Sequence, residues 1–366
     1  MKKTTIITMA VILCAAITGC YPTGEIASPE DASQYITDNK NTKESEDNGS
    51  SLSETSFENV ILNLNLPESP AEISEFDAVV HPWNREKLIE IFLGGKGTYS
   101  ETSYESDLTP QEMRYVYDTS DKYRLITESG YITYSDRSNP NRDEYTIFKS
   151  SWLYDDLNKI FGHDELDDFA LEQALNDAAN IMERCGITDY GEPIIYPLHA
   201  DKVNKYFSEN YGEMEKKNGT VYNVNWAKDE EAYLLVYPQM INGAPISLEK
   251  TNTSIIFTRT GITEFSVINW IDVIPDSIKS APVGYSSTDA ANIVIDHFES
   301  VILNSPVELC DCKLSMFPKT AATETPMHYV STWEFSIKKQ ADKDLFYFSS
   351  LNISAASGEE IERNKK

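Results

Sequence analysis

The sequence is poor in cysteine, histidine and basic residues, and each shortage excludes a class of function. The 366 residues include five cysteines and five histidines, with 31 Lys and Arg against 59 Asp and Glu, a net charge of −28. Such a charge repels nucleic acid and anionic lipid headgroups. The histidines are scattered, and neither His-Glu-x-x-His nor Gly-x-Ser-x-Gly occurs. The sequence therefore offers no recognisable catalytic motif.

The N-terminal segment has the pattern of a secretory signal. Lys2 and Lys3 precede an apolar run over 6–17, which is shorter than the roughly 20 residues of a bilayer-spanning helix. Ile17-Thr18-Gly19-Cys20 resembles the lipobox of bacterial lipoproteins. The resemblance implies removal of residues 1–19 and diacylation of Cys20. We therefore expect a lipid anchor on Cys20 and a place on the extracytoplasmic face of the cell membrane; an ordinary signal peptide is the alternative.

The remaining chain predicts a tether followed by a globular body. Its hydrophobic content of 40% and aromatic content of 11% are typical of folded domains. The predicted organisation is a signal peptide at 1–19, the lipidated cysteine with a disordered acidic, Ser-rich tether at 20–75, and α+β modules at 76–160, 161–275 and 276–366. We expect an α+β fold of tandem modules, each with one long helix packed on an antiparallel sheet.

Apolar periodicity supplies the elements of these modules. Residues at spacings of three and four predict long helices over 164–185 and 288–303, and shorter ones over 85–92 and 200–209. Alternating aromatic and apolar residues predict an antiparallel meander from 114 onward, one long strand over 262–274, and three C-terminal strands after residue 306.

The C-terminal stretch also carries a family resemblance. Ser286-Ser287-Thr288 opens a helix, Trp333-Glu334-Phe335 lies in a later strand, and a Ser-Gly-Glu turn closes the segment. Residues 286–361 resemble the PepSY-type module of bacterial secreted proteins and are similar to YycH/YycI-type regulators of Gram-positive cell-wall sensor kinases. The resemblance implies a binding or regulatory module outside the membrane, without catalytic residues. Residues 164–274 resemble it less, and 76–160 less again.

Candidate sites other than Cys20 have simpler structural explanations. Cys310 and Cys312 stand two apart, as metal thiolates would, but Leu314 and Met316 continue the same strand face, so we expect both in the core. A disulfide from Cys185 to either of them stays open. Nine tyrosines between Tyr99 and Tyr154 would suit glycan stacking, although tyrosine is also common in strands. We predict no catalytic, metal or cofactor site.

The expected function is accordingly non-enzymatic. We expect binding or regulation through an unidentified protein partner at the cell surface, with membrane contact through Cys20 and no nucleic acid. A solute- or glycan-binding lipoprotein is the alternative, and an unrecognised hydrolase is a weaker one.

Overall fold

The computed structural model describes residues 51–56, 59–106, 112–120, 122–139, 148, 157–210, 224–301, 303, 305–319, 325–342 and 345–361. All of them belong to one unit, residues 47–366, and Cys20 with the lipobox lies outside them. Among the described helices, none has the length and apolarity that crossing a bilayer would require.

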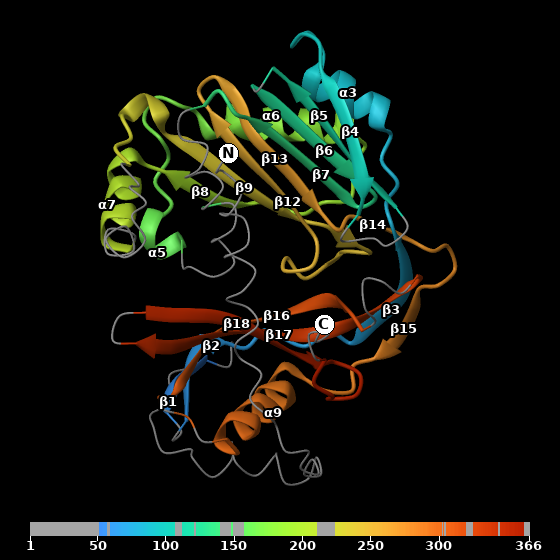
Figure 1. The fold of residues 1–366 in the computed structure, drawn as a ribbon. Helices are drawn as coiled ribbons and strands as arrows, with labels where there is room; N and C mark the ends of the chain where they lie inside the picture. Colours follow the sequence, from blue (N-terminus) through green and yellow to red (C-terminus); the bar gives the residue numbers. More distant parts are fainter. Residues whose placement is uncertain are drawn as a thin grey trace. The chain divides into compact units, whose positions relative to one another are not determined.

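The middle of the chain forms an eight-stranded antiparallel sheet, here called the central sheet (Figure 1). Its spatial order is β4-β5-β6-β7-β13-β12-β9-β8. The strands are β4 (Ser100–Glu105), β5 (Met113–Thr119), β6 (Tyr123–Glu128), β7 (Tyr131–Asp136), β8 (Ile194–Leu198), β9 (Ala232–Pro238), β12 (Asn252–Thr258) and β13 (Gly261–Ile268).

Both ends of the described chain meet in a second eight-stranded sheet, the terminal sheet. Its main order is β1-β2-β16-β17-β3-β14, with β15 beside β3 and β18 beside β17. The strands are β1 (Ser51–Ser56), β2 (Val60–Asn65), β3 (Glu72–Val80), β14 (Ile271–Val273), β15 (Lys279–Pro282), β16 (Val307–Pro318), β17 (Met327–Asp342) and β18 (Leu345–Ser354). β2 pairs in parallel with β16, and the other pairings of this sheet are antiparallel. A two-stranded hairpin, β10 (Met240–Ile241) and β11 (Ala244–Pro245), completes the described strands.

Amphipathic helices cover the apolar faces of the two sheets (Figure 1). Helices α3 (Arg85–Leu93) and α6 (Leu171–Cys185) pack on one face of the central sheet, where Phe92 stacks on Tyr134. Helices α5 (Leu157–Phe161) and α7 (Ala200–Asn210) share a second core with Leu234 and Ile256, which lie on the other face of the central sheet. Helix α9 (Ser287–Glu299) covers Trp333 and Phe335 of the terminal sheet. A 3₁₀ turn, η2 (Lys228–Glu230), precedes β9.

The predicted tandem modules are wrong. Strands at 100–136 and at 194–268 were expected in separate modules, but β7 pairs with β13, with Tyr134 opposite Phe265, and joins them in one sheet. β3, expected in the first module, instead pairs with β17 of the last. Alternation along a strand indicates which of its faces is buried, but it does not indicate which other strand forms hydrogen bonds with its backbone. The sequence pattern therefore gave the elements and missed their partners.

Strands also occupy part of the expected tether. β1, β2 and the start of β3 lie within 20–75, so this part of the tether prediction is corrected. In β2, Val60, Leu62 and Leu64 are buried and alternate with exposed residues. This short alternation becomes recognisable as a strand only once its partner β16, about 240 residues downstream, is known.

Helix α6 begins seven residues later than the sequence predicts. Residues 164–170 form a loop whose Leu166 and Phe169 enter the core of the central sheet. The Tyr233 hydroxyl accepts a hydrogen bond from the Leu166 N–H (2.9 Å) and donates one to the Phe169 carbonyl (3.1 Å). Arg259 donates to the Asp168 carbonyl as well (2.8 Å). Tertiary hydrogen bonds thus replace the helical ones over this segment.

The predicted strand over 262–274 is divided between the two sheets. Asn269 has a positive φ of 50°, which ends β13, and β14 then leaves to pair with β3. Asparagine adopts this left-handed conformation more readily than other non-glycine residues. One apolar run therefore crosses from the central to the terminal sheet.

We predict that Tyr233→Phe destabilises the protein by about 1–3 kcal/mol, because it leaves the Leu166 N–H and the Phe169 carbonyl buried without a partner. Chemical denaturation followed by circular dichroism measures this loss. Tyr237→Phe, in the same strand and core, is the control, since its hydroxyl bridges no backbone groups in the described residues. Equal losses in the two variants would show that the loop does not depend on Tyr233.

Candidate functional site

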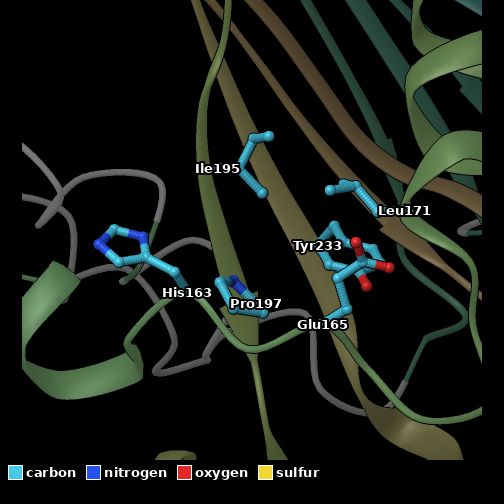
Figure 2. A pocket seen from close by; sticks show the side chains of 6 residues that line it. All are labelled: His163, Glu165, Leu171, Ile195, Pro197 and Tyr233. Carbon is cyan, nitrogen blue, oxygen red and sulfur yellow. The ribbon is translucent and has the colours of Figure 1, made fainter.

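A small pocket opens beside the 164–170 loop. His163, Glu165, Leu171, Ile195, Pro197 and Tyr233 line it (Figure 2). The His163 ring points away from the other side chains in Figure 2. The Tyr233 hydroxyl already makes the two backbone hydrogen bonds that hold the loop. The pocket therefore presents a mainly apolar wall, without convergent polar groups.

Buried carboxylates in the described residues are each matched by their own donor. Four glutamates are almost fully buried: Glu128, Glu231, Glu264 and Glu334. The Ser135 hydroxyl donates to Glu264 (3.1 Å), and the Ser315 hydroxyl donates to Glu334 (2.9 Å). Each acid thus has a separate donor within a strand ladder or loop, although Glu128 Oε2 and Glu231 Oε2 accept no hydrogen bond in the described structure.

The cysteines and histidines have structural places too. Cys185 lies in the core under α6, where burial raises the pKa of its thiol to about 12. Cys312 is buried in the separate core under α9, and burial raises the pKa of its thiol further. Cys310 sits at a bulge of β16 and is only half-buried, so the expectation that it shares the inward face is wrong. No disulfide joins any two of these three cysteines in the described structure.

Four of the described histidines, His81, His199, His297 and His328, pair with acids. His81 contacts Asp272 (2.8 Å), and His328 contacts Asp77 (2.8 Å). Across the described ranges, no group of three or more histidine, cysteine or acidic side chains is arranged to hold a metal ion.

The most distinctive surface is the free edge of the central sheet. Five large hydrophobic side chains are exposed in the described part of the chain, and three of them, Tyr99, Tyr104 and Met113, lie at β4 and β5. All six side chains of β4 are exposed. We call Tyr99, the strand β4, Met113, Arg114 and Tyr115 the β4 edge. Exposed aromatic, methionine and arginine residues are enriched in protein interfaces.

Two arginines stack on tyrosines at the β4 edge. The Arg85 guanidinium lies 3.7 Å from the centre of the Tyr115 ring. On the other face of the sheet, Arg114 lies between Tyr104 and Tyr131, 5.8 and 5.6 Å from their centres. These contacts hold flat, amphipathic groups in fixed orientations, which lowers the entropy lost when such a surface binds a partner.

A buried ion pair anchors this surface to the sheet. Arg114 donates to the fully buried Glu128 through Nε (3.2 Å) and Nη2 (2.6 Å). Burial lowers the pKa of Arg114, but hydrogen bonds with Glu128 and Tyr104 outweigh it and raise the pKa above its ordinary value. The register of β4, β5 and β6 places Tyr104, Arg114 and neighbouring Glu128 in one row across the strands.

The sequence did not reveal this site. Ser100–Glu105 has no buried residue, so β4 shows no apolar alternation, and the predicted meander starts one strand too late. Of the tyrosines weighed as stacking groups, Tyr117 and Tyr134 belong to the core, whereas Tyr99 and Tyr104 are exposed. The sequence feature that could have indicated this site was the cluster of tyrosines near two arginines.

We predict that Arg114→Met costs about 3–5 kcal/mol, because it leaves Glu128 buried without its charge partner. Denaturant unfolding measures the loss, and a second substitution, Glu128→Met, should recover most of it. Arg85→Met is the control: it also removes a tyrosine-stacked arginine, and should cost about 1 kcal/mol. A double variant as unstable as Arg114→Met would contradict the role of the ion pair.

Comparison with known proteins supports the fold and gives no function. No family model matches the chain, and no curated protein matches it. A crystal structure of an uncharacterized protein from Eubacterium rectale ATCC 33656 superposes with a TM-score of 0.61 at 10% sequence identity, over 85% of this chain and 92% of that one. At this identity the likeness establishes a shared fold alone, and it is a fold of large sheets, not of tandem helix-on-sheet modules.

Proposed function

We propose that the protein is a lipid-anchored, extracytoplasmic lipoprotein that acts without catalysis, by binding another protein at the cell surface. The sequence pattern ending at Cys20 supports the anchor. The net charge of −28 supports an anchor made by acyl chains and not by a basic patch.

The β4 edge is the observation that carries the binding role. It gathers Tyr99, Tyr104 and Met113 at a strand that is open on one side in the described structure. Tyrosine, methionine and arginine at such a place favour protein contact over a small ligand, because they are typical of protein interfaces, whereas small ligands bind in cavities. The pocket at Tyr233 supports the solute-binding alternative less well, because the Tyr233 hydroxyl is already hydrogen-bonded to the backbone of Leu166 and Phe169.

The C-terminal segment adds a second, weaker argument. Within 286–361, helix α9 is followed by β16, β17 and β18, which pair antiparallel in that order. This is the order that the resemblance to PepSY-type modules implies. We apply the resemblance to regulatory modules to this segment alone.

The anchor predicts that Cys20→Ser releases the protein from membranes, because only the thiol accepts the lipid. Fractionation after a high-salt wash, with metabolic labelling by a fatty acid, measures attachment. Cys14→Ser, within the same N-terminal segment, is the matched control and should leave attachment intact. A Cys20→Ser protein that stays membrane-bound and labelled would contradict the anchor.

The binding role predicts position-dependent photo-crosslinking. A photoreactive amino acid at Tyr99 or Met113 should trap one recurring extracytoplasmic protein in intact cells, because these side chains are exposed at the β4 edge. Ile278 and Ile61, equally exposed in the terminal sheet region, are control positions. The same adducts from the control positions, or none from the β4 edge, would refute a protein-binding surface there.

A further inference from the structure

The backbone of β4 forms an open ladder. β4 is the last strand in the order of the central sheet and pairs only with β5 among the described strands. Its register with β5 is unbroken from Ser100–Asp118 to Glu105–Met113, without a bulge. In an antiparallel strand alternate residues point their N–H and C=O groups outward. β4 therefore offers a regular row of unpaired donors and acceptors.

Two other edge strands of the described structure differ from β4. β8, at the opposite edge of the central sheet, contains Pro197 and is largely buried. β15 contains Pro282 within its four residues. Natural sheets protect their edges with proline, lysine, bulges or covering segments. β4 has no proline, lysine or bulge, and all of its side chains are exposed; its two glutamates are the charges that restrict which strand can pair with it.

The charges of β4 define what fits it. Glu101, Ser103 and Glu105 lie on one face of the strand, and Thr102 and Tyr104 on the other, beside Val116 and Arg114. A strand added at the edge would place its own side chains next to these, alternating between the faces. Basic residues four positions apart would meet Glu101 and Glu105, with a small residue at Ser103 and apolar residues at Thr102 and Tyr104.

We propose that β4 binds an extended, basic segment of a partner protein by strand addition, with the pattern basic, apolar, small, apolar, basic. This inference rests on the proposed protein-binding role and names the partner's chemistry. A second copy of this chain is disfavoured, because each copy carries a net charge of −28 and both edges would present glutamates. The acidic residues thus discourage self-pairing and favour a basic strand.

The test uses the purified full chain and the peptide Ser-Lys-Val-Thr-Val-Lys-Ser, followed by fluorescence anisotropy at low salt. Two control peptides separate the contributions. The first, Ser-Glu-Val-Thr-Val-Glu-Ser, reverses the charges. The second is the basic peptide with N-methyl groups at alternate residues, made in two versions, one methylated at the even positions and one at the odd positions. Each version keeps the charges and blocks hydrogen bonding along one edge of the peptide backbone. We expect binding of the basic peptide, no binding of the acidic one, and loss of binding for one of the two methylated versions.

Charge reversal on the protein completes the test. Glu101→Lys with Glu105→Lys should weaken the basic peptide about tenfold or more and allow the acidic peptide to bind, since two cross-strand attractions become repulsions. Glu68→Lys with Glu72→Lys is the matched control: both residues are exposed, have the same spacing and lie outside the central sheet. Binding by this control should stay within about twofold. Circular dichroism checks that both variants fold.

Three results would overturn strand addition. These are equal binding of both N-methylated peptides, equal weakening by the control variant, or no binding of the basic peptide. If photo-crosslinking at Tyr99 still traps a partner in that case, the protein-binding role stands and only its strand-addition form fails. If neither experiment succeeds, both proposals fail.

Discussion

The fold depends on how the backbone is satisfied where the chain passes between its two sheets. His81, leaving β3, donates its N–H to the Trp270 carbonyl (2.8 Å); Trp270 donates to Gly130 (2.9 Å), and Gly130 donates to His81 (2.8 Å). Nearby, the buried amide of Gln239 donates to the Ile271 carbonyl (2.7 Å) and accepts from its N–H (3.2 Å). Buried backbone groups must find partners. These bonds therefore fix where β13 stops, where β14 starts and which sheet each strand joins.

The same requirement explains the β4 edge. Along the central sheet each strand forms backbone hydrogen bonds with its neighbours as far as β4. The outer side of β4 has no partner strand in the described structure. Arg114 lies one strand inside that edge and Glu128 two strands inside it, and their ion pair holds Arg114 beside Tyr104 and Tyr131. The ion pair thus holds part of an exposed surface in place, and a preorganised surface loses less entropy when it binds a partner.

Sequence patterns predicted the locally determined parts of the fold. Asn84 accepts from the Lys87 N–H and starts α3, and a capping box of Ser286 and Asp289 starts α9, one residue before the expected cap. The strands β5 to β7 follow their aromatic alternation. Long-range choices were not predictable: the loop at 164–170 depends on Tyr233, and β4 has no buried residue that would mark it as a strand. The expected lipid site at Cys20 rests on sequence alone, and the β4 edge required the structure.

The terminal sheet draws its strands from both ends of the chain, which has a consequence for biogenesis. β2 finds its partner β16 only after some 240 further residues, and β3 must wait for β17. During N-to-C synthesis the central sheet can close first, while β2 has only β1 beside it and β3 waits for β14, β15 and β17. Such non-local pairing folds slowly and exposes sticky strands meanwhile. The acidic residues around the early strands, among them Glu68, Glu72 and Glu75, lie where electrostatic repulsion would keep waiting chains apart.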